Sequence, residues 1–171
     1  MAKQFDVVVI GGGLAGASCA LSVAKTNPTL NIAVVEANQV TGDYHPSFDD
    51  RSIALAQQSV EYLQSLNLFE QNAHYTAAIK KVSVSDRGHF GKAHINCDEF
   101  AKPSLGYVVE VNPFGRALHL RLTQSNITLL CPDSVIAIEQ TLHSNTLTLQ
   151  SGEQLSAALL VIADGAQSPT R

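Results

Sequence analysis

The chain has 171 residues, of which 45% are hydrophobic and 15% charged, and its formal net charge is −4. This composition is too apolar for a disordered protein, and it lacks the basic stripe of a nucleic-acid binder, so no nucleic-acid partner is expected. The length suits one compact domain with a sizeable core. Neither the six histidines nor the three cysteines (Cys19, Cys97 and Cys131) form a metal-binding pattern, and the cysteine usage favours a cytoplasmic location.

The first 36 residues predict a strand, a helix and a second strand. Residues 5–10 are a continuous apolar run, which is typical of a strand buried on both faces. Residues 14–25 carry apolar side chains at helical spacing, and residues 31–36 form a second β-branched run. This order is a βαβ unit, so the two strands should be parallel.

The middle of the chain predicts a loop, two helices and two strands. We expect a loop over residues 37–50, a helix that begins near Ser52 and a half-exposed strand over residues 80–85. Residues 106–111 should form another strand, and Asn112 and Pro113 suit the cap and first turn of a helix. The residues expected to be buried are Ile53, Ala56, Val60 and Leu63 in the first helix, and Phe114, Ala117, Leu118 and Leu122 in the second.

The last third of the chain predicts short strands. Residues 127–131, 134–140, 146–150 and 153–156 are brief runs separated by turn residues, which indicates a small antiparallel meander. Residues 159–162 should then return to the parallel sheet as a buried strand. The whole pattern predicts an α/β fold, with a parallel sheet and a small antiparallel three-stranded meander.

A glycine-rich segment joins the first strand to the first helix. Residues 11–16 satisfy the pattern G-x-G-x-x-G, the signature of a Rossmann-like dinucleotide-binding turn. Gly11 allows the tight turn, Gly13 lets the backbone approach a pyrophosphate, and Gly16 allows close packing of helix on strand. The free N–H groups at the start of the helix would bind the phosphates. The predicted cofactor-binding residues of this segment are Gly11, Gly13, Leu14, Ala15 and Gly16.

An acidic residue completes this pattern. Glu36 follows Gly16 by 20 residues, at the end of the second predicted strand, where a carboxylate can bind ribose hydroxyls. No basic residue lies between Glu36 and Arg51, so the 2′-phosphate of NADP is disfavoured in this site. The pattern is compatible with either NAD or FAD as the bound dinucleotide.

Two further segments resemble the flavin-dependent aromatic hydroxylases. Asp164 and Gly165 follow an apolar run and begin the pattern D-G-x-x-S-x-x-R, which is similar to the Asp-Gly fingerprint of that family. In the family this fingerprint is implicated in binding both the FAD pyrophosphate and the reducing nicotinamide cofactor. Residues 48–55 resemble the family segment whose arginine, here Arg51, contacts FAD. The resemblance implies FAD as cofactor and NAD(P)H as reductant.

Three shorter stretches, residues 45–49, 84–89 and 106–110, resemble the ubiquinone-biosynthesis branch of the family. With them the resemblance covers essentially the whole chain. It implies an FAD-dependent monooxygenase that uses NAD(P)H and O2 to hydroxylate a polyprenylated phenol, with no side chain of this chain assigned as catalytic. It also implies peripheral association with the inner face of a membrane and with other ubiquinone-biosynthesis proteins.

One departure from the family concerns a third motif, of Gly-Asp-Ala-x-His type. Gly42 and Asp43 are followed by other residues and do not match it. We therefore expect residues 1–171 to be the N-terminal part of an FAD-binding domain, with part of the substrate-domain sheet near residues 79–111 and the C-terminal remainder absent. Alone, such a chain should be inactive and should self-associate. The alternatives are another FAD oxidoreductase of the same fold, such as a reductase or halogenase, an NAD-dependent dehydrogenase, and a catalytically inactive FAD-binding fragment.

Overall fold

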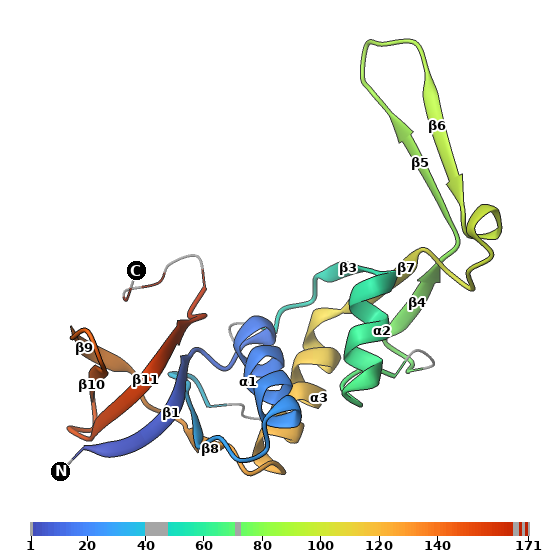
Figure 1. The fold of residues 1–171 in the computed structure, drawn as a ribbon. Helices are drawn as coiled ribbons and strands as arrows, with labels where there is room; N and C mark the ends of the chain where they lie inside the picture. The colour runs from blue at the N-terminus through green and yellow to red at the C-terminus, as the bar shows by residue number, and fades with distance from the viewer. Residues whose placement is uncertain (1, 40–47, 71–72, 166–167, 169, 171) are drawn as a thin grey trace. The chain divides into compact units, whose positions relative to one another are not determined.

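The structure is a computed structural model that describes residues 2–39, 48–70, 73–165, 168 and 170. The chain divides into two compact units (Figure 1). Unit 1 comprises Met1–Asp49 and Gly115–Arg171, and unit 2 comprises Asp50–Phe114. The Gly42-Asp43 pair and the first three residues of the predicted stretch at residues 45–49 lie outside the described residues.

Unit 1 is built on a six-stranded sheet with the order β8-β2-β1-β11-β10-β9. Strands β8, β2, β1 and β11 are parallel neighbours, whereas β10 and β9 continue the sheet in antiparallel fashion beside β11. The predicted parallel sheet with a three-stranded meander is confirmed. The strands are β1 (Lys3–Ile10), β2 (Ile32–Val35), β8 (Thr128–Leu130), β9 (Val135–Gln140), β10 (Asn145–Leu149) and β11 (Gln154–Ile162).

The predicted βαβ unit is also confirmed. Helix α1 (Leu14–Thr26) connects β1 to β2 and buries small side chains, among them Ala17 and Ala20. Small residues let the helix lie close to the strands, as Figure 1 shows for α1 and β1. The core of the sheet is apolar and includes Val8, Leu147 and Leu155, all fully buried. This core fixes the carboxyl ends of the parallel strands, where the candidate site lies.

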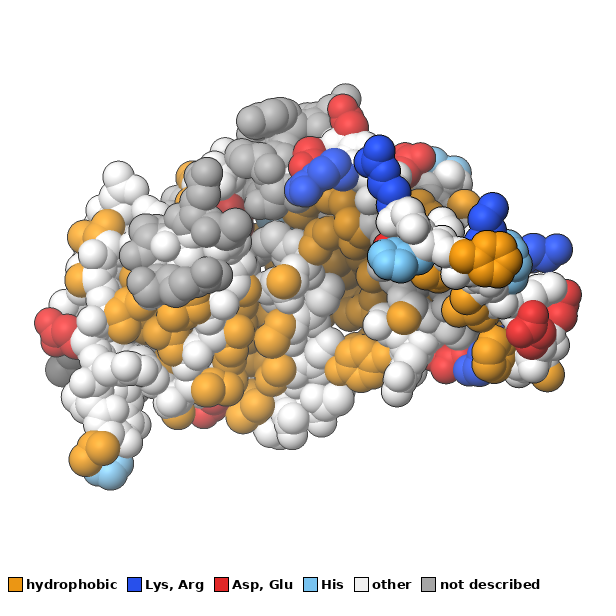
Figure 2. All heavy atoms as spheres, turned by 90° about the horizontal axis from the view of Figure 1, so that it is seen from above, with side chains coloured by type: hydrophobic (Ala, Val, Ile, Leu, Met, Phe, Trp, Pro, Cys, Tyr) orange, Lys and Arg blue, Asp and Glu red, His pale blue; other side chains and the backbone are white. Residues whose placement is uncertain are grey.

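The prediction for the end of the chain was wrong in one respect. Residues 153–156 and 159–162 do not form separate strands, because β11 runs without interruption from Gln154 to Ile162 and pairs with β1 over almost its full length. It is not buried on both faces either. Leu160 packs against the core, whereas Leu159 on the opposite face is 54% exposed. Hydrophobic side chains are visible on the surface in the region of this sheet (Figure 2).

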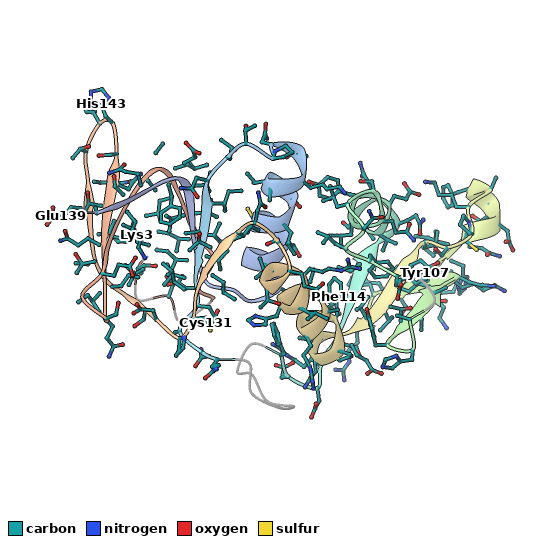
Figure 3. All side chains as sticks on the ribbon, turned by 90° about the horizontal axis from the view of Figure 1, so that it is seen from below. Lys3, Tyr107, Phe114, Cys131, Glu139 and His143 are labelled. Atoms are coloured by element: carbon teal, nitrogen blue, oxygen red, sulfur yellow. The ribbon has the colours of Figure 1, made fainter. Side chains whose placement is uncertain are left out.

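Unit 2 contains a three-stranded antiparallel sheet with the order β3-β7-β4. Its strands are β3 (Ser52–Ala56), β4 (Thr76–Ile79) and β7 (Gly106–Glu110), and helix α2 (Gln57–Ser65) follows β3. Three aromatic rings pack edge to face: the Phe69 centroid lies 5.6 Å from that of Tyr107 and 6.0 Å from that of Phe114. Tyr107 and Phe114 are labelled in Figure 3.

The predicted helix near Ser52 begins later than expected. Residues 52–56 form strand β3 instead, and the helix begins at Gln57, with Val60 and Leu63 buried as predicted. The residues of β3 alternate between exposed and half-buried, as a strand does. Ile53 pairs with Val109 of β7, so pairing with a strand far along the chain decides the structure of this segment.

The second predicted helix begins two residues earlier than expected. Helix α3 spans Val111–Thr123, so Asn112 lies in its first turn rather than at its cap. Phe114, Leu118 and Leu122 are buried as predicted, whereas Ala117 is half-buried. In the part of the chain that the structure describes, no helix is long and apolar enough to cross a membrane.

The remaining elements of unit 2 form a separate hairpin. Strand β5 (Lys81–Ser85) was predicted, but as a half-exposed strand, whereas both of its faces are exposed. It pairs with β6 (Lys92–Asn96), which was not predicted, and a short 3₁₀ helix, η1 (Cys97–Phe100), follows. Every residue from 80 to 95 is exposed. Figure 1 shows the hairpin extending away from β4 and β7 of the same unit.

Candidate cofactor site

A cavity of about 330 Å³ lies within unit 1, at the carboxyl ends of β1, β2 and β11. This is the edge of a parallel sheet at which α/β proteins bind their ligands, and the volume is in the usual range for small-molecule sites. Most of the predicted cofactor-binding residues line it, namely Gly11, Gly13, Leu14, Ala15, Glu36, Asp164 and Gly165. The fold therefore brings together residues that are far apart in the chain.

The glycine loop adopts a conformation that two of its glycines make possible. Gly11 has φ +98°, a left-handed conformation, and a Cβ there would lie 2.5 Å from the carbonyl oxygen of Ala163. A Cβ on Gly16 would collide with the carbonyl oxygen of Gly11. Gly16 is not among the residues that line the cavity. Its lack of a side chain instead lets α1 pack directly against the glycine loop that does line it.

The N-terminus of α1 faces the cavity through Gly13, Leu14 and Ala15. Gly13 is the cap residue, no side chain caps the helix, and its first turn holds no acidic residue. The N–H groups of a first helical turn have no partner inside the helix, and the positive end of the helix dipole lies there. An uncapped helix start of this kind suits a phosphate group.

Glu36 is a buried carboxylate, only 4% exposed, at the end of β2. Its Oε2 accepts a hydrogen bond from the backbone N–H of Gly12 at 2.6 Å, and its Oε1 accepts one from that of Asn38 at 2.7 Å. The side chain thus ties the glycine loop to the segment that follows β2, in addition to lining the cavity. The sequence pattern predicted the position of Glu36 but not its hydrogen bonds to Gly12 and Asn38.

Asp164 contributes a second carboxylate to the cavity, at the end of β11. Its Oδ2 accepts a hydrogen bond from the Thr170 hydroxyl at 2.7 Å, whereas its Oδ1 is buried with no partner among the described residues. Burial would raise the pKa of Asp164, but hydrogen bonds from Ser168 and Thr170 hold that pKa below its usual value. The carboxylate is therefore charged at neutral pH, and it suits a ligand that brings a hydroxyl donor.

The sequence analysis missed one side of the cavity. Asn38 follows β2, and Asp133, Ser134 and Val135 come just after β8 or at the start of β9. The Asp133 N–H donates to the Glu36 carbonyl at 2.9 Å, which fixes this segment beside β2. The available signal was the predicted strand at residues 127–131, because a parallel strand directs the residues that follow it to the same edge of the sheet.

Asp133 organises the segment between β8 and β9. Its Oδ1 accepts from the Ser134 N–H at 2.8 Å, and its Oδ2 accepts from the Ser151 hydroxyl at 2.5 Å. Burial acts to raise the pKa of Asp133, but these hydrogen bonds and those from backbone N–H groups outweigh it, so the pKa lies below its usual value. The ionised carboxylate therefore stabilises the folded chain.

We expect Asp133→Asn to lower the free energy of unfolding by about 1 kcal/mol at neutral pH, because one acceptor oxygen is lost. Since the folded-state pKa is lowered, the contribution of the carboxylate is present above the unfolded pKa of about 3.9 and is lost as the pH falls through the folded value. Denaturant unfolding at several pH values checks this. The difference between wild type and variant should shrink in acid, and Glu139→Gln, at an exposed acid of β9, should show no such difference. A difference independent of pH would contradict the assignment.

Two other residues complete the description of this edge. The Cys131 Sγ donates to the Asn38 carbonyl at 3.4 Å, and burial, together with the nearby Glu36 charge, raises the pKa of its thiol. Figure 3 shows Cys131 at the opposite end of the sheet from His143, which lies in the β9–β10 turn.

Arg51 belongs to unit 2 and is not among the residues that line the cavity, so its contact with FAD stays a prediction. In the described ranges, no cluster of three or more potential metal ligands occurs.

Comparison with known proteins places this site in a family context. Ubiquinone hydroxylase UbiL of Rhodospirillum rubrum is 27% identical over 175 residues, which span 99% of this chain and 39% of the relative. The 3-demethoxyubiquinol 3-hydroxylase of Escherichia coli is 29% identical over 170 residues, which span 97% of this chain and 42% of that enzyme. The expected resemblance to the ubiquinone-biosynthesis branch is confirmed, and the chain spans about two-fifths of the length of these relatives.

A solved structure supports the same fold. The p-nitrophenol 4-monooxygenase PnpA of Pseudomonas putida superposes with a TM-score of 0.78 at 20% identity, over 100% of this chain and 43% of that one. The family model described as pyridine nucleotide-disulphide oxidoreductase matches residues 5–171, which is nearly the whole chain. The chain therefore belongs to the pyridine nucleotide-disulphide oxidoreductase family.

Proposed function

We propose that this chain forms the cofactor-binding part of an FAD-dependent monooxygenase. The observation that carries the proposal is the cavity at the sheet edge, where an uncapped helix start, the Glu36 carboxylate and the Oδ1 of Asp164, which has no partner among the described residues, meet. Each of these groups suits one part of a dinucleotide. The similarity to ubiquinone hydroxylases along the chain supports the same conclusion.

FAD fits the donors and acceptors of the cavity. The N–H groups at the start of α1 would hold the pyrophosphate, and Glu36 would bind hydroxyls of the adenosine ribose. The buried Oδ1 of Asp164 lacks a partner among the described residues and would accept a hydrogen bond from a further cofactor hydroxyl. The ribityl chain of FAD supplies such hydroxyls, as does the nicotinamide ribose of NAD, so FAD is proposed here because of the similarity to ubiquinone hydroxylases along the chain.

The proposed reaction is hydroxylation of a polyprenylated phenol in ubiquinone biosynthesis. Bound FAD, once reduced by NAD(P)H, would supply the chemistry of this reaction. That chemistry uses O2 to insert one oxygen atom into an electron-rich ring. The residues of this chain bind and orient the cofactor, and none is assigned as a general acid or base. We further propose that residues near 79–111 contribute to the substrate-domain sheet, and that the enzyme acts in the cytoplasm at the inner face of the membrane, beside other proteins of the pathway.

The test uses the full-length enzyme that contains this chain. We expect the purified protein to show flavin absorbance, to release FAD on denaturation, and to consume O2 with NAD(P)H when a polyprenylated phenol is added. The product should gain one oxygen atom by mass spectrometry. Protein without flavin would overturn the cofactor assignment. Flavin reduction without an oxygenated product would instead indicate a reductase of the same fold.

A further inference from the structure

The β8–β9 segment, residues 131–134, forms one wall of the cofactor cavity without belonging to a helix or a strand. It connects β8 and β9, which are the two edge strands of the six-stranded sheet. Asp133 and Ser134 line the cavity, together with Val135 at the start of β9. Because no strand ladder fixes these four residues, other hydrogen bonds have to hold this wall in position.

The turn between β10 and β11 supplies such hydrogen bonds. The Ser151 hydroxyl donates to Oδ2 of Asp133 at 2.5 Å, and the Ser151 N–H donates to Oδ1 at 3.3 Å. The Gln150 N–H donates to the Ser134 carbonyl at 2.8 Å, and the Ser134 hydroxyl donates to Oε1 of Gln150 at the same distance. The turn is thus bonded to both polar residues of the cavity wall.

Asp133 also connects the wall to the residue proposed to bind ribose. The Asp133 N–H donates to the Glu36 carbonyl at 2.9 Å, and the Glu36 N–H donates to the Leu130 carbonyl at 2.9 Å. Ser151 is not among the residues that line the cavity, so its hydroxyl reaches the cavity wall through Asp133. A continuous path of hydrogen bonds therefore runs from the β10–β11 turn to the backbone of Glu36.

We propose that Ser151 is a positioning residue for the adenosine end of the bound dinucleotide, and that it acts by holding Asp133 and the β8–β9 segment in the binding geometry. The inference rests on the proposed function, in which the start of α1 binds the pyrophosphate and Glu36 binds the adjacent ribose. The base follows the ribose in the dinucleotide, and the β8–β9 segment is the wall bonded to Glu36. A wall that is fixed before binding spares the ligand the cost of ordering it.

Titration of the full-length apoenzyme with FAD and with ADP tests this role. ADP carries the adenosine and the pyrophosphate but neither the ribityl chain nor the flavin ring, so it reports on one half of the site. Ser151→Ala should weaken both ligands by the same factor, about fivefold, because one hydrogen bond that orders the wall is lost. Ser151 is exposed, so Ser151→Thr can keep the hydroxyl in place and should bind both ligands like wild type.

Ser144→Ala is the matched control. Ser144 lies in the β9–β10 turn, and its hydroxyl contacts that of Thr141 at 3.2 Å rather than a residue of the cavity. This variant should leave both dissociation constants unaltered. NAD(P)H oxidation at saturating FAD should be unaltered even in Ser151→Ala, since the adenosine end governs affinity for the cofactor rather than its reaction. Circular dichroism and denaturant unfolding show whether each variant is folded under the assay conditions.

A double-mutant cycle separates positioning through Asp133 from a general loss of stability. In a protein that already carries Asp133→Ala, Ser151→Ala should weaken ADP binding no further, because the acceptor of its hydroxyl is gone. Independent effects would instead multiply, so the double variant would show the product of the two single losses. Multiplied losses would overturn the proposed path through Asp133.

The two ligands also separate failure of this inference from failure of the proposed function. Ser151→Ala that binds ADP as tightly as wild type, or that weakens FAD but not ADP, would overturn the inference alone. Wild type that binds neither ligand would overturn it together with the dinucleotide site on which it rests. Wild type that binds ADP but not FAD would overturn the choice of FAD, and the ADP comparison would still decide the role of Ser151.

Discussion

Replacing Gly13 with valine is expected to abolish flavin binding in the full-length enzyme while leaving its fold intact. Gly13 is the cap of α1 with φ −66° and ψ −172°, an extended conformation that valine adopts readily. The residue lines the cavity, so the added methyl groups would occupy the space where the backbone must approach the pyrophosphate. The fold should survive because the backbone needs no adjustment.

The measurement is flavin content by absorbance after gel filtration, together with thermal unfolding. Ala24→Val, near the far end of the same helix, is the matched control and should retain flavin at the wild-type level. Near-normal flavin content in Gly13→Val would show that the pyrophosphate does not approach α1 here. Loss of the folded protein would show that Gly13, like Gly11 and Gly16, is required by packing instead.

Local sequence was sufficient to predict the parallel half of unit 1. Apolar runs at residues 5–10 and 31–36 flank a helix of small residues, and the structure places β1, α1 and β2 there. Strands buried on both faces give continuous apolar runs, and these are the easiest strands to identify. The glycine pattern then predicted the loop correctly, because φ +98° at Gly11 and the close approach at Gly16 both require glycine.

The elements that were missed depend on partners far along the chain. Strand β3 exists because it pairs with β7, more than fifty residues later, and its small and β-branched residues are compatible with a helix when considered alone. Strand β6 carries Lys92 and His94 and is exposed throughout except at Asn96, so it lacks the apolar signal of a strand. Such segments take their structure from pairing rather than from propensity.

The candidate site also combines residues that local sequence predicted with residues whose role depends on distant partners. Gly11, Glu36 and Asp164 were predicted, since each stands directly after a strand in a recognisable pattern. Asp133 was not, because its role depends on hydrogen bonds with Ser151, which lies in the turn before β11. Polar residues that organise a cavity through contacts between distant turns leave no periodic trace in the sequence.

Glu36→Ala is the second change with a large expected effect, because this carboxylate has two roles. Removing it would leave the N–H groups of Gly12 and Asn38 without the acceptors that they have at 2.6 and 2.7 Å. Hydrogen bonds to a charged group contribute about 1.5–3 kcal/mol each, so we expect a loss of about 3 kcal/mol in the free energy of unfolding. Loss of the ribose contact should also weaken FAD binding by about 10- to 150-fold.

Glu36→Gln separates the two roles of the side chain. Glutamine keeps the size and one acceptor oxygen, but its NH2 group must face the N–H of either Gly12 or Asn38, and two donors cannot bond to each other. We therefore expect a stability loss for Glu36→Gln smaller than that of Glu36→Ala, and a weakened FAD affinity for both. Denaturant unfolding and flavin titration of the apoenzyme measure the two effects separately. Glu139→Ala, at an exposed acid of β9, is the matched control and should change neither quantity. An unaltered dissociation constant for FAD in both Glu36 variants would leave Glu36 as a residue that only holds the glycine loop in place.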